Sequence, residues 1–152
     1  MCLPNYSLLN IHIMKRTATA HWEGDFKEGK GNLTSQSSVL NKTPYSFKTR
    51  FEEGGGTNPE ELIAAAHAGC FTMAVDLQLT QKGSKPEMLE TKATVDLDMA
   101  ALKITAIHLE LKGKVNGLSE DDFQAIAESA KETCIISKAL NVPITLNASL
   151  VG

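Results

Sequence analysis

The chain has 152 residues, of which 42% are hydrophobic and 22% are charged, and its formal net charge is -3. This length favours one domain with a full hydrophobic core, and the weakly acidic balance argues against nucleic acid or an anionic membrane as a partner. No uncharged apolar run reaches the ~18 residues of a membrane span. The basic pair Lys15 and Arg16 follows the first apolar stretch, unlike the order in a signal peptide. We therefore expect a cytoplasmic protein.

Residues 1–14 differ in character from the rest, and Met14 reads like a second translation start. We predict an atypical N-terminal leader over residues 1–14 and a single domain over residues 15–152. Cys2 falls in this leader and receives no role.

The first part of the domain is predicted to be extended. Roughly alternating side chains predict strands over residues 17–24 and 32–37, joined by a turn at residues 29–31. Residues 45–51 alternate aromatic and polar side chains, which predicts a third strand or extended segment. This segment carries Arg50.

The next stretch has the signals of a long helix. Asn58 is a good N-cap, Pro59 suits the first helical position, and Glu61 stands where a capping-box acid reaches back to the cap. Residues 62–75 contain no formal charge, and a helix that is apolar all round is normally buried. We predict a central core helix that carries Cys70 and ends near residue 82.

The second half of the chain predicts two strands, a helix and a last strand. Residues 90–98 and 103–115 alternate and should pair antiparallel. Ser119 caps a helix whose apolar stripe includes Cys134, so the Cys134 side chain should face inward. Residues 143–150 close the chain as an alternating strand. The order β-β-β-α-β-β-α-β indicates an α+β domain whose two helices cover one sheet face.

Three cysteines, at positions 2, 70 and 134, are too few for a disulfide scaffold or a zinc site. If the two helices cross near Cys70 and Cys134, the pair could form a redox-active disulfide; the alternative is two unrelated small core residues. His67 lies one turn before Cys70, but a metal site needs about two further ligands that no spaced cluster supplies. We therefore expect His67 and His108 to serve packing and polar structure, with no metal.

A reactive thiol must be a thiolate, and burial among apolar groups opposes its ionisation. Arg50 is the candidate cation, and Glu60 is the acid that would orient it; the alternatives are a solvated strand charge and a first-turn acid. Ten residues of helix separate Glu60 from Cys70 by ~15 Å. A straight helix cannot bring both to one thiol, so we expect an intertwined homodimer with composite sites.

The sequence resembles the OsmC/Ohr family of thiol peroxidases over residue 15 to the end. The similarity lies in Trp22-Glu23-Gly24-Asp25, Tyr45-Ser46-Phe47-Lys48-Thr49-Arg50-Phe51, and the specific block from Asn58-Pro59-Glu60-Glu61-Leu62 to His67-Ala68-Gly69-Cys70-Phe71. The His-Ala-Gly-Cys run is closer to the OsmC branch than to the Ohr branch. The chain departs from the family at its leader and at Cys134-Ile135-Ile136, where members often have Cys-Pro.

This resemblance implies an OsmC-like intertwined homodimer with antiparallel sheets packed on two main helices per chain. It further implies reduction of organic hydroperoxides, and more weakly of hydrogen peroxide, in defence against oxidative and osmotic stress. Cys70 matches the peroxidatic thiol, Cys134 the resolving thiol, and Arg50 and Glu60 the activating pair. No cofactor is implied; the reductant would be an external dithiol of lipoyl type. The alternatives are a redox sensor and a non-catalytic protein that binds apolar ligands.

Overall fold

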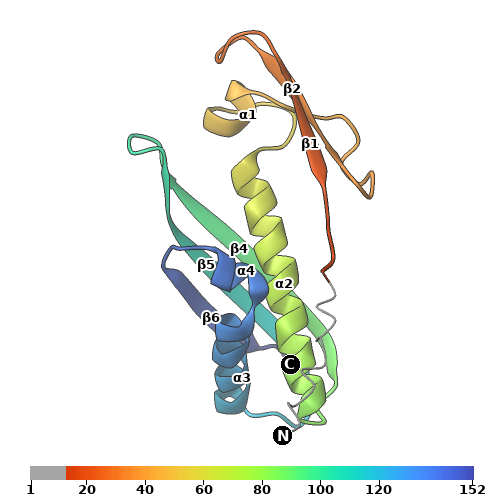
Figure 1. Cartoon of the computed structure of the whole chain (residues 1–152). Helices are drawn as coiled ribbons and strands as arrows, with labels where there is room; N and C mark the ends of the chain where they lie inside the picture. The colour runs from red at the N-terminus through yellow and green to blue at the C-terminus, as the bar shows by residue number, and fades with distance from the viewer. Residues whose placement is uncertain (1–12) are drawn as a thin grey trace, which may run out of the picture.

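The computed structural model describes residues 13–152 (Figure 1), so Cys2 and nearly all of the predicted leader lie outside the described residues. The elements follow in the order β1 (Ala18–Glu23), β2 (Lys30–Ser35), β3 (Thr43–Tyr45), α1 (Phe47–Phe51), α2 (Pro59–Gln81), β4 (Pro86–Asp98), β5 (Lys103–Val115), α3 (Glu120–Thr133), α4 (Ile135–Ala139) and β6 (Ile144–Leu150). The α+β class and the order of the strands and main helices agree with the sequence.

The first sheet has the order β1-β2-β3 and is antiparallel throughout. The predicted turn at residues 29–31 is wrong, because Lys30 and Gly31 already belong to β2. The chain reverses earlier, where the Asp25 carboxylate accepts from the amides of Lys27 and Glu28. Gly31 serves close packing instead: a Cβ there would lie 2.7 Å from the Trp22 ring.

The predicted extended segment over residues 45–51 is also wrong beyond Tyr45, because Phe47–Phe51 forms the short helix α1. The Ser46 side chain accepts from the Thr49 amide, and the Thr49 side chain accepts from the Ser46 amide. These two bonds form a complete capping box at the start of α1. Phe47 and Phe51 are four residues apart, so they share a helix face, and their ring centroids lie 5.0 Å apart. The aromatic spacing read as strand alternation therefore fits a helical turn equally well.

Helix α2 begins as predicted. The Asn58 side chain accepts from the Glu61 amide at 2.8 Å, and Pro59 is the first helical residue. The Glu61 carboxylate accepts from the Thr57 hydroxyl at 3.2 Å, where the sequence predicted a bond from the cap amide. The helix ends at Gln81 with Lys82 as its C-cap, and Gly83 follows with a φ of +76°, the left-handed conformation that glycine adopts without strain.

One face of α2 is buried and the opposite face is open. Phe71, Val75 and Leu79 are fully buried, whereas Met73 and Leu77 are 75% and 57% exposed. The expectation of a helix buried all round is therefore not met within one chain. By length and composition α2 could also cross a membrane, contrary to the expectation from its uncharged run, although core helices of globular domains pass the same test.

The second sheet has the order β4-β5-β6 and carries the core. Strands β4 and β5 pair antiparallel as predicted, but β6 runs parallel to β5, so this sheet is mixed and not antiparallel. The cause is the connection: α3 and α4 lie between β5 and β6 and return the chain in the same direction. Helices α2 and α3 pack on this sheet and on each other.

The first sheet stands at the N-terminal end of α2, away from the second sheet (Figure 1). Five of the six residues of β1 are exposed. A three-stranded sheet needs a hydrophobic face covered by another layer to be stable. Among the described residues, the exposed β1 and the open face of α2 are surfaces that lack such a layer.

Candidate active site

The two predicted redox thiols lie at the place where α2 meets the junction of α3 and α4. Cys70 is on α2 and half-buried, while Cys134 is 1% exposed, and neither is in a disulfide. Cys134 was predicted on the inner stripe of the second helix. It does face inward, but it ends α3 and begins α4 instead of lying within a helix.

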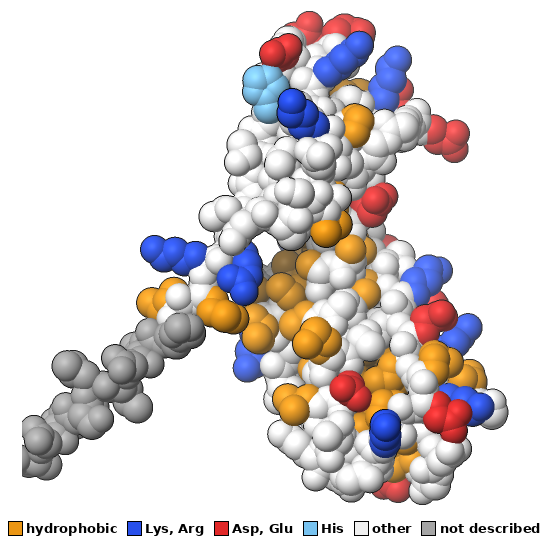
Figure 2. Space-filling view, turned by 90° about the vertical axis from the view of Figure 1, so that its right-hand side faces the viewer, with side chains coloured by type: hydrophobic (Ala, Val, Ile, Leu, Met, Phe, Trp, Pro, Cys, Tyr) orange, Lys and Arg blue, Asp and Glu red, His pale blue; other side chains and the backbone are white. Residues whose placement is uncertain are grey.

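Cys70 and the buried Cys134 both line one groove of ≈ 870 Å³. The groove is mostly apolar, and its nonpolar lining comes from Met73, Ala74, Leu77 and Ile135. Hydrophobic side chains gather over the middle and lower parts of the molecule in the space-filling view (Figure 2). The structure thus brings the two predicted thiols together, beside a surface suited to an alkyl or aryl group.

The environment of Cys134 favours its thiolate. Burial of Cys134 opposes ionisation and is the largest single influence, but the Ser137 amide and hydroxyl, the Cys70 thiol and the Ile136 amide together outweigh it, so the pKa of Cys134 is lowered. Donor groups lower a thiol pKa because they interact more strongly with sulfur when it is negative.

Arg50 and Glu60 form the second pair that the structure brings together. The Glu60 Oε1 atom accepts from Arg50 Nη2 at 2.8 Å and from Arg50 Nε at 3.1 Å. The Arg50 guanidinium also lies over the Phe51 ring, 5.1 Å from its centroid. The buried Glu60 Oε2 atom has no hydrogen-bond partner among residues 13–152. One carboxylate oxygen therefore holds the arginine in position, and the Arg50 side chain remains partly exposed to solvent.

The two pairs are not brought together within one chain. Glu60 is the second residue of α2, and Cys70 lies ten residues further along this uninterrupted helix. At 1.5 Å per residue the two positions are ~15 Å apart along the axis. Neither Arg50 nor Glu60 lines the groove that holds the thiols. The single chain therefore presents a thiol pair and a guanidinium–carboxylate pair as separate half-sites.

A third element of the thiol region was not predicted. His67 is fully buried on α2, and its Nε2 atom lies 2.8 Å from the Ser137 hydroxyl oxygen on α4. The sequence placed His67 correctly in packing, but nothing in it pointed to Ser137. Ser137 could not be predicted because the helix that carries it, α4, has only five residues, too few to show helical periodicity in the sequence.

The buried His67 gives a prediction for stability against pH. Burial lowers the pKa of His67 from its ordinary value of 6.5. The unfolded chain then binds a proton that the folded chain resists, so stability should fall as pH drops below about 6.5, by at most ~1.4 kcal/mol per pH unit. Urea unfolding at several pH values measures this slope, and His67→Gln should flatten it. Equal slopes for the two proteins would contradict the prediction.

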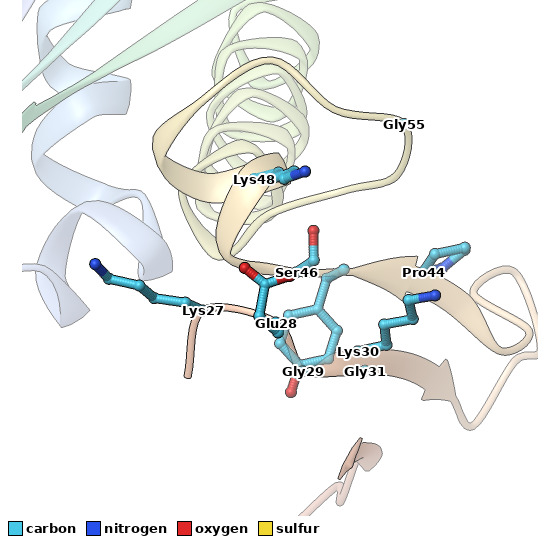
Figure 3. A pocket seen from close by; sticks show the side chains of 10 residues that line it. Lys27, Glu28, Gly29, Lys30, Gly31, Pro44, Ser46, Lys48 and Gly55 are labelled. Atoms are coloured by element: carbon cyan, nitrogen blue, oxygen red, sulfur yellow. The ribbon is translucent and has the colours of Figure 1, made fainter. Parts of the chain in front are cut away.

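Another pocket, of ≈ 270 Å³, lies between the first sheet and α1 (Figure 3). Its side chains include Lys27, Glu28, Lys30 and Lys48, and none of the predicted site residues lines it. Among residues 13–152 no group of three His, Cys, Asp or Glu side chains is placed to hold a metal ion.

Comparison with known proteins agrees with this geometry. The OsmC-like protein family matches residues 52–149. Peroxiredoxin OsmC of Escherichia coli is 48% identical over 144 residues, covering 93% of this chain and 99% of that protein. Organic hydroperoxide resistance protein-like 1 of Staphylococcus saprophyticus is 37% identical over 101 residues, covering 63% of this chain and 71% of that protein.

Solved structures share the fold. The organic hydroperoxide resistance protein OhrB of Bacillus subtilis has a TM-score of 0.63 and 25% identity, covering 88% of this chain and 98% of that chain. An organic hydroperoxide resistance protein from Elizabethkingia anophelis has a TM-score of 0.72 and 23% identity, covering 93% of this chain and 99% of that chain.

Proposed function

The chain belongs to the OsmC/Ohr family, and from that premise we propose that it is a thiol peroxidase that reduces organic hydroperoxides to alcohols. The observation that carries the proposal is the placement of two free thiols side by side in one apolar groove. A thiol peroxidase needs one nucleophilic sulfur to break the peroxide bond. It then needs a second thiol within reach of the oxidised sulfur to form a disulfide.

Cys70 is the proposed peroxidatic residue because it is the more accessible of the two thiols. Its thiolate attacks the distal oxygen of the hydroperoxide, the O–O bond breaks, and the leaving alkoxide takes a proton to become the alcohol. Cys70 is left as a sulfenic acid. The groove beside it favours organic substrates over hydrogen peroxide, since each buried methylene contributes ~0.8 kcal/mol to binding.

Cys134 is the proposed resolving residue. Its sulfur attacks the Cys70 sulfenic acid, a disulfide forms, and water is released. An external dithiol then regenerates the enzyme by thiol–disulfide exchange; family similarity favours a lipoyl-type dithiol. A reducing compartment would keep the two thiols free between turnovers, which supports a cytoplasmic role in oxidative and osmotic stress defence.

Arg50 and Glu60 are the proposed activating pair, and they require a second copy of the chain. Glu60 fixes Arg50 in place, but this pair and Cys70 of the same chain are ~15 Å apart along α2. The open apolar face of α2, with Met73 and Leu77, and the uncovered first sheet are surfaces that a partner would bury. We infer an intertwined homodimer in which Arg50 of one protomer faces Cys70 of the other.

A single-turnover experiment tests the function. One equivalent of cumene hydroperoxide added to the reduced protein should produce a mass loss of two hydrogens and link the Cys70 and Cys134 peptides. A dithiol such as dihydrolipoamide should then restore the reduced mass and sustain turnover. Peroxide that remains unconsumed, with both thiols intact, would exclude the proposal and leave a protein that binds apolar ligands.

A redox sensor is separated from a peroxidase by the same sample. The sensor would form the disulfide once but would not turn over rapidly when the dithiol is present in excess. An enzyme should consume many equivalents of hydroperoxide per protein chain at steady state. The amount of alcohol formed measures this consumption.

A further inference from the structure

We propose that two hydrogen bonds from α2 to the junction of α3 and α4 hold the Cys134 sulfur within reach of Cys70. The inference rests on the proposed peroxidase function and adds to it positioning residues for the step that forms the disulfide. The four residues that make these bonds, which we call the clasp, are His67, Gln78, Thr133 and Ser137.

On α2, the two bonds stand on either side of Cys70. His67 precedes Cys70 by three residues, and Gln78 follows it by eight. At 3.6 residues per turn, these three positions fall within about 80° of one another around the helix axis, so they share one face. Helices α3 and α4 both contact α2 (Figure 1). Cys70 therefore lies between two side chains that bond to the segment opposite.

On that opposite segment, the same two bonds stand on either side of Cys134. Thr133 is the residue before Cys134, and Ser137 is the third residue after it. Thr133 bonds to the later part of α2 and Ser137 to the earlier part, so the two segments run in opposite directions. The two bonds thus bracket the pair of thiols that line the groove.

Cys134 is the joint between two helices. Helix α3 ends at Thr133 and α4 begins at Ile135, and Cys134 between them has a ψ of 125°, far from the helical value of about -42°. Because the helix is interrupted there, the backbone hydrogen bonds of α3 do not continue into the first turn of α4. The position of the Cys134 sulfur therefore depends on what holds each helix to α2.

The two helices of the junction are held differently. Helix α3 buries four side chains in the core, those of Phe123, Ile126, Ala127 and Ala130. Within residues 13–152, the five residues of α4 include none that is fully buried, and Ile136 packs only partly against the core. A helix this short is not stable by itself. Its place against α2 therefore depends on a specific bond.

His67 supplies that bond from inside the core. The imidazole is fully buried, and its Nε2 atom lies 2.8 Å from the Ser137 hydroxyl oxygen. The other ring nitrogen, Nδ1, has no hydrogen-bond partner among residues 13–152. A buried polar group that loses its partner carries the full cost of leaving water. The ring therefore favours the arrangement in which Ser137, and α4 with it, stays against α2.

Gln78 supplies the second bond. Its Nε2 atom donates to the Thr133 Oγ1 atom at 3.1 Å, and the Thr133 hydroxyl donates in turn to the Ser129 carbonyl at 3.1 Å. The last residue of α3 is therefore tied to α2 and to its own helix. Gln78 and Thr133 also line the groove that holds the two thiols. This bond consequently lies beside the sulfurs that react.

The clasp serves the step that forms the disulfide. The Cys134 thiolate attacks the Cys70 sulfur, the S–S bond forms, and the S–O bond of the sulfenic acid breaks. The hydroxide that leaves combines with the proton given up by the Cys134 thiol, and the Cys134 sulfur supplies the two electrons. Holding two reacting groups in place raises their effective concentration. Without the clasp, disulfide formation must itself order the junction, so the disulfide should form more slowly and be less stable.

Equilibrium with glutathione measures the clasp without any peroxide. One glutathione disulfide and the reduced protein give the Cys70–Cys134 disulfide and two glutathione thiols, and the equilibrium constant is the effective concentration of the protein thiols. In a Cys2→Ser background, Ser137→Ala and Thr133→Val should each lower this constant by about fivefold, the net effect of one hydrogen bond. The double variant should lower it by roughly tenfold or more. An unchanged constant in the double variant would overturn the proposal.

A hydrogen bond from α2 to another part of the fold provides the matched control. The Thr72 hydroxyl donates to Thr91 Oγ1 of β4 at 2.7 Å, so Thr72→Val removes a bond of the same kind away from the junction. Urea unfolding of the reduced protein should show a loss of stability similar to that of Ser137→Ala, but the glutathione equilibrium should match the parent. Ser137→Thr, which keeps the hydroxyl, should also match it. An equal fall in the constant for Thr72→Val would show general loosening of the fold and contradict a specific clasp.

Pre-steady-state kinetics separate this inference from the proposed function. For Ser137→Ala, Cys70 sulfenic acid should form at the parent rate, disulfide formation should slow by about fivefold, and a sulfenic acid trap should capture more Cys70. If the sulfenic acid resolves at the parent rate, the clasp has no role in this step although the peroxidase stands. If no sulfenic acid forms in the parent enzyme, the peroxidase proposal fails, and the glutathione equilibrium still decides whether the clasp holds the thiols together.

Discussion

Replacing Cys70 by serine is expected to abolish hydroperoxide turnover. A serine hydroxyl is not ionised near neutral pH and does not form a sulfenic acid, so the first chemical step has no substitute. The two side chains are nearly the same size, and Cys70 is only half-buried, so the fold should persist. We expect kcat/KM for cumene hydroperoxide to fall by about 10³-fold or more, measured by peroxide consumption with a dithiol in excess.

The other two cysteines make this result specific. Cys134→Ser should still consume one equivalent of hydroperoxide but leave Cys70 as a sulfenic acid that a trap can label. Cys2→Ser should retain full activity, because Cys2 has no part in the proposed chemistry. Turnover by Cys70→Ser at the rate of the parent protein would exclude the mechanism and show that another residue is the nucleophile.

The fold was predictable where side-chain periodicity and caps agree. Asn58 and Pro59 at one helix and Ser119 at the other fixed both helix starts, because a cap side chain has only a few amides to satisfy. The thirteen-residue strand Lys103–Val115 was predicted with the correct bounds, since its alternation is long and regular. The errors fall on short elements, where few residues define a period: α1 was taken for a strand, and α4 was missed.

The parallel pairing of β6 could not be read from its sequence. Residues Ile144–Leu150 alternate in the same way whichever direction the strand runs. The direction is set by the α3–α4 connection, which is a property of the tertiary fold.

Within the candidate site, the local pairs were predictable and their joint arrangement was not. Cys70 and Cys134 were expected on inward faces, and the structure places them in one groove. Arg50 was assigned to a strand, yet the short α1 delivers it to Glu60 all the same. The hydrogen bond between His67 and Ser137 joins α2 to α4, and no local sequence pattern encodes such a contact.

The separation of the two half-sites has one consequence for assembly. A straight α2 holds Glu60 and Cys70 of one chain apart, and that distance follows from helix geometry alone. Within one chain, the open face of α2 leaves apolar side chains unburied, and the strand β1 is left exposed. A two-fold dimer would cover these surfaces and bring each Arg50 toward the thiols of the other protomer, because such an interface uses the same patch twice.

Mixing an impaired variant with an inactive one is therefore expected to restore activity. Arg50→Ala should lower kcat/KM by about 10²-fold, the usual cost of removing one charge-stabilising donor, and Cys70→Ser should be inactive. In a heterodimer of the two, one composite site has lost both residues while the other keeps Arg50 from one chain and Cys70 from the other. Random association then gives about a quarter of parental activity per chain. The two chains are purified separately and refolded together, and the peroxidase activity of the mixture measures this fraction.

The converse mixture distinguishes composite sites from sites within one chain. The double variant Arg50→Ala/Cys70→Ser, paired with the parent chain, leaves no intact composite site in the heterodimer, because each site lacks one of the two residues. An equal mixture should then retain about a quarter of parental activity per chain, whereas sites confined to one chain would retain about half. No restoration in the first mixture, together with half activity in the second, would place Arg50 and Cys70 in a single chain. That outcome would require α2 to break between Glu60 and Cys70, since an unbroken helix holds the two residues ~15 Å apart.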